Sequence, residues 1–365
     1  MTERSRVVIE LGAVRANVRR LREALGPRAL FAVVKADGYG HGAVDVGRVA
    51  LDEGAEALCV ATLGEARALR DALPEARVIV MGPLAPGEER EADGLEVVVG
   101  TEDVWARVRD RTDLGVHVKV ETGMGRWGLD PDAALAVGRT LADARGTPGP
   151  RLCGLMSHLA TADETDTAFA RRQVRAFARV AEAFPPCVRH LANSAGTLRL
   201  PEARFDAGRC GIALYGISPS NDDPADDGLV PALRWTSQVA ALRRLAPGES
   251  TGYGRRLIAE EPLTIALVPV GYADGYPRNL SGVASALVRG RRRQVAATVS
   301  MDQLVLRLEP GDEDVAVGDE VTLVGVDGDE RVRLEELAGL IGTLGYELAT
   351  RLTPRPQRVA REVRD

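Results

Sequence analysis

The chain has 365 residues, of which 45% are hydrophobic and 27% are charged, and its net charge is −6. This length and composition suit a globular protein of two domains, or one large domain with an appendage. Arginines interleaved with acids give no indication of a nucleic-acid or anionic-membrane partner, and no apolar run approaches the ~20 residues of a membrane span.

The amino terminus and the cysteines favour a cytoplasmic location. The apolar stretch 7–9 is too short for the hydrophobic region of a signal peptide. The four cysteines lie in apolar surroundings and form no Cys-x-x-Cys pair, which is typical of reduced core thiols. The four histidines show no metal-ligand spacing, and we therefore expect no metal.

Short apolar runs alternate with amphipathic stretches in the first part of the chain. The predicted strands are Phe31–Lys35, Ala57–Ala61, Arg77–Met81, Glu96–Val99, Val116–Val120, Leu152–Met156, Val188–Leu191 and Arg209–Leu214. Predicted helices between them include Ala43–Glu53, Leu63–Ala72, Pro131–Ala144 and Asp166–Phe184. The alternation predicts parallel strands with right-handed crossovers, and eight such units close a (β/α)8 barrel. An open doubly wound sheet would also alternate, but the first βα turn lacks Gly-x-Gly-x-x-Gly.

The alternation of strands and helices ends at a polar, turn-rich linker, residues 218–228. The closely spaced strands predicted after it are Ser237–Arg243, Leu263–Val270, Ala284–Arg289, Gln294–Val299, Gln303–Leu308 and Glu320–Val324, followed by a helix at Leu334–Gly342. The sequence therefore predicts an α/β protein in which a TIM-like (β/α)8 barrel (residues 1–230) precedes a mostly β domain (residues 231–365). The first strand residues are candidates to join the β domain.

Two of the 47 basic residues are lysines, Lys35 and Lys119. Arginine stays protonated, whereas lysine loses its proton and then serves as a base or as the amine of a Schiff base. Lys35 closes the first predicted barrel strand, and the carboxyl ends of barrel strands form the active-site face. Position alone leaves a solvated lysine at a strand end as an equally good interpretation.

The segment VVKADGYGHG (residues 33–42) resembles the pyridoxal-phosphate attachment motif of the alanine racemases. The other matching segments are VKVETGMGRWG (118–128), MSHLATADE (156–164), ANSAG (192–196), RCGIALYG (209–216), GYG (252–254), VGYADGYPR (270–278) and SMDQ (300–303). They follow the family's order over roughly residues 7–350, which makes the resemblance specific.

This resemblance implies that Lys35 binds pyridoxal 5′-phosphate covalently and later acts as the base on one face of the substrate α-carbon. Tyr253 is implied as the base on the opposite face, since racemisation removes a proton from one side and returns one to the other. Without the resemblance, Tyr253 would be interpreted as a half-buried tyrosine with a satisfied hydroxyl.

The remaining cofactor residues are also implied by the resemblance. Arg209 matches the arginine facing the pyridine nitrogen, where a fixed cation disfavours protonation of the ring. His158 is implied to hold Arg209, although a histidine at a strand end is more often a core residue. The phosphate-binding set matches Tyr39, Ser194, Gly211 and Ile212, and Asn193 matches a neighbouring cofactor-site residue.

The substrate site follows from the same resemblance. Arg126 is implied to reach the substrate carboxylate with its planar fork of donors. Tyr272 and Met301 match residues that narrow the site around a small side chain, although Met301 also suits a core position. Lys119 matches a lysine that is often carbamylated, and the carbamate would orient Arg126. An unmodified, salt-bridged Lys119 remains the alternative.

One departure concerns the phosphate. Family members often place a tyrosine near it close to the carboxyl end, whereas residues 350–355 here read TRLTPR and Tyr346 is the nearby tyrosine. We leave that contact unassigned.

The sequence thus predicts an alanine racemase that supplies D-alanine for peptidoglycan, acting as a homodimer in which Tyr253 and Met301 enter the partner's site. One alternative is a racemase of another small amino acid such as serine. A decarboxylase on this fold would need a glycine triplet and a cysteine in the second domain, but the last cysteine is Cys210. A cofactor-carrying regulatory protein made of a barrel alone would not need the second domain.

Overall fold

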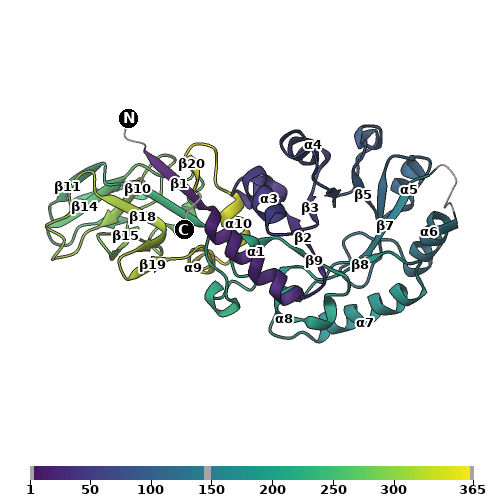
Figure 1. The fold of residues 1–365 in the computed structure, drawn as a ribbon. Helices are drawn as coiled ribbons and strands as arrows, with labels where there is room; N and C mark the ends of the chain where they lie inside the picture. The colour runs from purple at the N-terminus through teal and green to yellow at the C-terminus, as the bar shows by residue number, and fades with distance from the viewer. Residues whose placement is uncertain (1–3, 144–148, 362–365) are drawn as a thin grey trace. The chain divides into compact units, whose positions relative to one another are not determined.

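The structure is a computed structural model that describes residues 4–143 and 149–361 (Figure 1). The chain divides into two compact units. The barrel unit contains Val14–Leu214 and residues 227–229, and the β unit contains the described residues up to Ala13, Tyr215–Asp226 and the described residues from Val230 onward. Within the described ranges, no helix is both long enough and apolar enough to span a bilayer.

Eight parallel strands in the described part of the barrel unit form a closed barrel. They are β2 (Ala29–Val33), β3 (Ala57–Val60), β4 (Val78–Val80), β5 (Glu96–Val99), β6 (Gly115–Lys119), β7 (Arg151–Met156), β8 (Val188–His190) and β9 (Ala207–Cys210). The pairing of Phe31 in β2 with Arg209 in β9 closes the ring. This barrel, together with the mostly β unit, confirms the predicted fold class.

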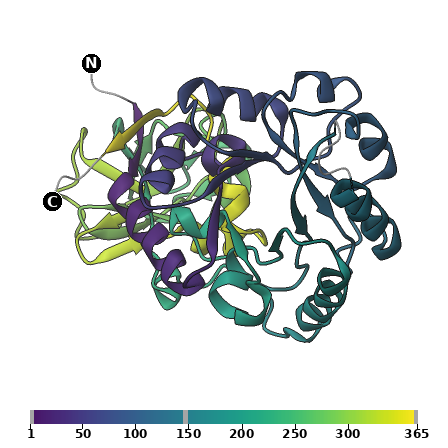
Figure 2. The same cartoon turned by 45° about the vertical axis from the view of Figure 1, so that its right-hand side comes forward.

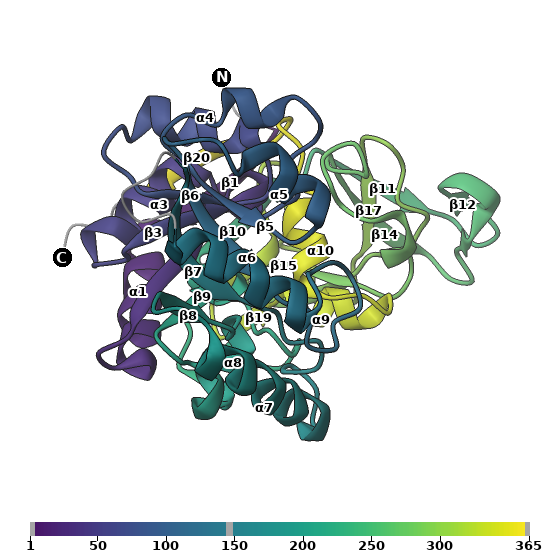
Figure 3. The ribbon, with the colours of Figure 1, turned by 90° about the vertical axis from the view of Figure 1, so that its right-hand side faces the viewer.

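Helices cover the outside of the barrel, as the two rotated views show (Figures 2 and 3). They are α1 (Leu11–Leu25), α3 (Ala43–Asp52), α4 (Leu63–Ala72), α5 (Glu102–Val108), α6 (Pro131–Asp143), α7 (Ala168–Ala183) and α8 (Ser194–Arg199). The longer ones bury an apolar stripe, such as Ala170, Val174 and Phe177 in α7. The predicted helix end at Ala144 lies outside the described residues.

Two predicted barrel strands extend too far. β2 ends at Val33, because residues 36–40 adopt positive φ and turn the backbone out of the sheet. Lys35 therefore begins the short turn α2 (Lys35–Tyr39) rather than closing the strand. β9 ends at Cys210, and the 3-10 turn Ile212–Tyr215 follows in place of further strand. An apolar run cannot distinguish a buried strand from a buried turn, because both exclude water.

The β unit contains three sheets in its described residues. The largest has the order β16-β15-β18-β10-β1-β20, with β19 paired to β18, and the smaller ones are β11-β14-β17 and β12-β13. The bounds are β1 (Ser5–Glu10), β10 (Leu233–Gln238), β11 (Ala241–Leu245), β12 (Ser250–Thr251), β13 (Leu257–Ile258), β14 (Leu263–Val268), β15 (Ser285–Val288), β16 (Arg291–Gln294), β17 (Leu304–Arg307), β18 (Glu320–Asp327), β19 (Glu330–Val332) and β20 (Gln357–Arg361). Two helices complete the unit, α9 (Leu334–Leu340) and α10 (Gly345–Thr350).

Two strand predictions in the β unit were wrong. The predicted strand Ser237–Arg243 is divided between β10 and β11, which pair with β18 and β14 in different sheets. The predicted strand Gln294–Val299 is also misplaced, because the regular strand is β16, at residues 291–294. β16 is rich in arginine and has an edge position, where charged side chains block pairing with other chains, so its polarity concealed it.

Candidate active site

Lys35 emerges from the barrel on a left-handed turn. Ala36, Asp37 and Tyr39 have φ of 53°, 51° and 51°, a region that costs a side-chain-bearing residue about 1–2 kcal/mol. Backbone hydrogen bonds within residues 34–43 compensate, including Gly40 N–H to the Ala36 carbonyl at 3.0 Å. The Asp37 carboxylate accepts the Ala43 N–H at 3.0 Å, which joins the turn to the start of α3.

Glu65 anchors the same turn from the neighbouring helix. Its Oε1 accepts the Ala36 N–H at 2.7 Å, and its Oε2 accepts the N–H groups of Ala61 and Thr62 at 2.8 and 3.1 Å. The Thr62 hydroxyl accepts the Glu65 N–H in return, so that the pair forms a capping box for α4. One carboxylate thus joins the backbone just after Lys35 to the backbone at the start of α4. Sequence analysis missed this role, although Thr-x-x-Glu before a helix was visible.

The Lys35 amine lies in partly buried, positively charged surroundings. Burial lowers its pKa, the nearby Arg126 lowers it further, and Glu65 partly opposes both effects. The Nζ atom lies 5.8 Å from the centroid of the Tyr39 ring. Lys35 is therefore more often an uncharged nucleophile near neutral pH than a free lysine is.

Arg209 lies almost fully buried in β9, with 3% of its surface exposed. Its Nη1 donates to the His190 carbonyl at 2.6 Å and to His190 Nδ1 at 2.9 Å. Its Nη2 donates to the Ser157 and Leu191 carbonyls at 2.6 and 3.2 Å. His158 Nδ1 lies 3.3 Å from the same nitrogen, so the predicted pairing of His158 with Arg209 is present in the structure.

None of these direct partners of Arg209 is a carboxylate. Burial accordingly lowers the pKa of Arg209 to about 10, and burial followed by the charges of Arg209 and Arg126 lowers the pKa of His158 well below its usual range. His158 is therefore a neutral ring whose Nδ1 accepts a hydrogen bond from Arg209. The end of the barrel that carries Lys35, Lys119, Arg126 and Arg209 has an excess of positive charge, which suits an anionic ligand.

The predicted phosphate residues meet where β8 and β9 end. The Ser194 hydroxyl accepts the N–H groups of Gly211 and Ala213 at 3.0 and 3.4 Å, and Asn193 caps α8 by accepting the Gly196 N–H at 2.9 Å. A Cβ on Gly211 would lie 2.6 Å from the Tyr39 hydroxyl, so glycine is required to admit the Tyr39 ring. Ile212 opens the 3-10 turn that follows.

Lys119 is the last residue of β6 and is 3% exposed. Its Nζ donates to the Trp127 carbonyl at 2.7 Å and lies 4.2 Å from the centroid of the Trp127 ring. Burial, then the charges of Arg126 and Arg209, lower its pKa to about 7. The main chain of the loop returns to the same residue, since the Leu129 N–H donates to the Lys119 carbonyl at 2.9 Å. Lys119 is thus packed inside the loop that presents Arg126.

The three predicted residues of the β unit are exposed. Tyr253 is 72% exposed in a tight turn, and Met301 and Tyr272 are 52% and 42% exposed. Tyr253 and Met301 line one cleft of about 510 Å³. The loops of Tyr272 and Met301 are joined by a backbone hydrogen bond of 3.0 Å from the Ala273 N–H to the Met301 carbonyl.

Residues 350–355, the stretch that lacks the tyrosine often found in the family, have a different structural role. Arg355 donates to Asp274 at 2.7 Å and to Asp302 at 2.8 Å. It thereby ties the loop of Tyr272 to the loop of Met301. Sequence analysis missed this role, because a surface arginine without a distinctive motif carries no signal for its partners.

Comparison with known proteins gives the same family for both units. A model described as "Alanine racemase, N-terminal domain" matches residues 9–219, and one described as "Alanine racemase, C-terminal domain" matches residues 232–360. The alanine racemase of Symbiobacterium thermophilum is 41% identical over 362 residues, which cover 96% of this chain and 95% of that protein.

Solved structures agree with the sequence comparison. The alanine racemase of a D-cycloserine-producing Streptomyces lavendulae has a TM-score of 0.91 at 39% identity, covering 99% of this chain and 98% of that one. The alanine racemase of Bartonella henselae, solved with covalently bound pyridoxal phosphate, has a TM-score of 0.85 at 27% identity, with coverage of 98% and 99%. The chain belongs to the alanine racemase family.

Proposed function

We propose that the chain interconverts L-alanine and D-alanine with pyridoxal 5′-phosphate as its cofactor. The observation that carries this proposal is the Lys35 amine, held in a strained turn at the mouth of a barrel with its pKa lowered. The curated relatives named as alanine racemases, and the Bartonella henselae enzyme with its covalently bound cofactor, support it. The product D-alanine would serve peptidoglycan synthesis in the cytoplasm of a bacterium.

The donor set suits this cofactor. Lys35 supplies an amine for its aldehyde, Arg209 a buried cation for its pyridine nitrogen, and the region of Tyr39, Ser194, Gly211 and Ile212 supplies hydroxyl and backbone donors for its phosphate. Asn193 orders the start of α8 beside them, and His158 holds Arg209. When bound, the cofactor acidifies the α-proton of the attached amino acid.

The chain's own residues would then move that proton. Lys35 holds or releases it at Nζ on one face of the α-carbon, and Tyr253 does so at its hydroxyl on the other. Arg126 would orient the substrate carboxylate, while Tyr272 and Met301 would leave room for a methyl group only. A barrel amine and a β-unit phenol approaching from opposite sides favour inversion over exchange on one face.

The exposure of Tyr253 supports a shared site in a homodimer. An aromatic side chain that is 72% exposed beside an exposed methionine is typical of a surface that another chain covers. We propose that Tyr253 and Met301 of one protomer complete the site around Lys35 of its partner.

A panel of L-amino acids tests the substrate. We expect alanine to be turned over about 10–100-fold faster than serine, measured as kcat/KM, because an apolar pocket rejects an added hydroxyl only moderately. Serine turnover equal to or better than that of alanine would replace the proposal with a serine racemase.

The two bases should act on different enantiomers. In Tyr253→Phe, we expect exchange of the α-proton with solvent deuterium to slow by about 10²–10⁴-fold for L-alanine and far less for D-alanine, measured by mass spectrometry of recovered substrate. Tyr346→Phe, in α10 of the same unit, is the matched control and should behave like the wild type. Equal slowing for both enantiomers would remove the assigned face.

Mixing two inactive variants tests the shared site. If Lys35 and Tyr253 come from different protomers, a mixed dimer of Lys35→Ala and Tyr253→Phe chains contains one intact site. Random mixing should restore about a quarter of the wild-type activity, since half of the dimers are mixed and each has one intact site of two. Activity that stays at the level of the unmixed variants would show that both residues serve the same protomer's site.

Lys119 should react with carbon dioxide. An uncharged amine adds CO2 to give a carbamate and releases one proton, and a pKa of about 7 leaves about half of the Lys119 amines uncharged at neutral pH. With ¹³C-labelled CO2 we expect a carbamate NMR signal that is lost as the pH falls below 7, that is absent in Lys119→Arg and that persists in Lys35→Ala. A spectrum identical in the wild type and Lys119→Arg would favour the unmodified lysine.

A further inference from the structure

A chain of buried polar side chains leads from Arg209 through the interior of the barrel. Arg209 Nη1 lies 2.9 Å from His190 Nδ1, and His190 Nε2 lies 2.8 Å from His117 Nδ1. His117 Nε2 lies 2.8 Å from Oε2 of Glu96. Glu96 opens β5, whereas Arg209 lies beyond the midpoint of β9, so the chain spans strands β5, β6, β8 and β9. We call these four residues the Arg209 relay.

The proton positions in the relay follow from the donors alone. A guanidinium nitrogen is only a donor, so His190 Nδ1 must accept and His190 must carry its proton on Nε2. His190 donates that proton to His117 Nδ1, so the single ring proton of His117 lies on Nε2 and faces the carboxylate. Because a protonated Glu96 would leave His117 without any proton, Glu96 is ionised. The geometry therefore specifies two neutral rings that donate in one direction, from Arg209 towards Glu96.

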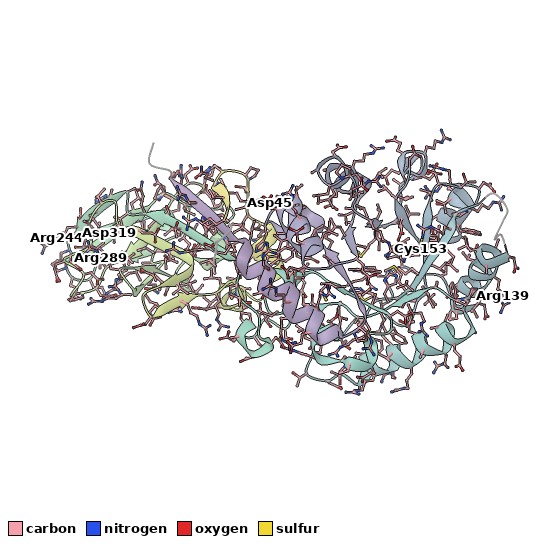
Figure 4. All side chains as sticks on the ribbon, viewed as in Figure 1. Asp45, Arg139, Cys153, Arg244, Arg289 and Asp319 are labelled. Atoms are coloured by element: carbon pink, nitrogen blue, oxygen red, sulfur yellow. The ribbon has the colours of Figure 1, made fainter. Side chains whose placement is uncertain are left out.

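The neighbouring strands make room for this relay. A Cβ on Gly154 in β7 would lie 2.4 Å from His117 Nδ1 and 2.8 Å from the Val188 carbonyl. A Cβ on Gly115 in β6 would lie 2.7 Å from Cγ of Glu96 and 2.5 Å from Sγ of Cys153, a residue of β7 that is labelled in Figure 4. Two glycines in barrel strands thus leave space that these side chains occupy. Burying polar groups there costs free energy unless each of them is hydrogen-bonded.

The far end of the relay is anchored by arginines. Arg77 binds the Glu96 carboxylate through two nitrogens at 3.0 and 2.8 Å, and Arg151 adds a third contact at 3.1 Å. Burial raises the pKa of Glu96, but hydrogen bonds from His117 and Arg77 outweigh it and hold this pKa well below its usual range. Burial lowers the pKa of both histidines. These directions agree with an ionised carboxylate and two neutral rings.

The same place offers three metal-ligating side chains, since ligand atoms of Glu96, His117 and Cys153 lie within 4.8 Å of one another. A cation there would compete with two guanidinium groups for the carboxylate and would need the Nε2 lone pair of His117, which the relay has protonated. The charges and the proton positions therefore favour the relay over a metal site.

We propose that Glu96, acting through His117 and His190, is a positioning residue that fixes the orientation of Arg209. The direct partners of Arg209 are carbonyl oxygens and ring nitrogens, so the relay supplies the carboxylate that this buried cation otherwise lacks. Each ring, polarised by the acceptor behind it, offers a stronger lone pair to the donor in front. The consequence for racemisation rests on the proposed function, whereas the relay itself does not.

The first arm of the test measures tautomers without using activity. The chain has four histidines, so ¹⁵N-histidine NMR of the purified full chain, assigned with His117→Gln and His190→Gln, resolves each ring. We expect His117 and His190 to be neutral with the proton on Nε2 at every pH between 5 and 9. A proton on Nδ1 of either ring, or a charged ring, would overturn the relay, as would displacement of the His117 signals by stoichiometric Zn²⁺.

The second arm tests whether a change at Glu96 alters His190, the relay residue next to Arg209. In Glu96→Gln, the Nδ1 signal of His190 should shift although His190 does not contact residue 96, and kcat for alanine should fall about 10-fold with little change in KM. Glu89→Gln is the matched control, since Glu89 is also a buried carboxylate of the barrel unit paired with an arginine, Arg107, but lies outside the relay, and this variant should leave the His190 signal and kcat unchanged. A His190 signal that is unaffected in Glu96→Gln would refute the proposal.

The two arms separate the possible failures. If the wild-type chain does not racemise alanine, the proposed function fails, and the tautomers and the transmitted shift still decide the relay. If racemisation is present and Glu96→Gln retains the wild-type kcat, the positioning role fails while the proposed function stands. Should Glu96→Gln not fold, the tautomers of the wild-type chain remain decisive.

Discussion

The burial of one guanidinium group, that of Arg209, sets the conditions for the rest of the barrel site. A cation that is 3% exposed and directly bonded to no carboxylate must be held by many weaker acceptors, and carbonyl oxygens from the ends of two strands provide them. Burial, reinforced by the charge of Arg209, lowers the pKa values of His158 and His190, and burial with the charges of Arg126 and Arg209 lowers that of Lys119 to about 7. The site therefore combines positive charge with histidine rings that stay neutral and lysine amines that lose their protons more readily than free lysine.

Backbone strain and glycine residues also help to place the side chains of the barrel site. The left-handed turn after Val33 presents the Lys35 amine at the barrel mouth, and Glu65 ties this turn to the start of α4 by accepting the Ala36 N–H as well as two N–H groups before that helix. Gly211 admits the Tyr39 ring beside Ser194, and Gly154 admits the His117 ring inside the barrel. Residues with unfavourable conformations or no side chain are thus concentrated where ligand-facing groups have to be placed, as expected for a functional site.

The β unit contributes loops that are distant from one another in the sequence but are joined in the structure. Arg355 joins the loops of Tyr272 and Met301, and Gly271 lets those loops approach, since a Cβ there would lie 2.2 Å from the Ser300 carbonyl. The exposed side chains of Tyr253, Met301 and Tyr272 are therefore carried by an ordered framework. Such preorganisation is what a residue needs if it is to meet a reacting atom supplied by another chain.

Hydrophobic periodicity in the sequence predicted the order of the eight barrel strands, because it reports locally which segments are buried. The resemblance of the sequence motifs to those of the alanine racemases, several in the same order, made Lys35, Tyr253, Arg126 and Arg209 the candidates for the site. Sequence analysis misplaced strand ends at Lys35, Gln238 and Gln294, where a turn, a change of sheet or a charged edge follows an unbroken local pattern. Only the tertiary structure could join Glu96 to His117, His190 and Arg209, or Arg355 to Asp274 and Asp302. These partners are distant in the chain, and no local pattern records which polar groups will satisfy one another once water has been excluded.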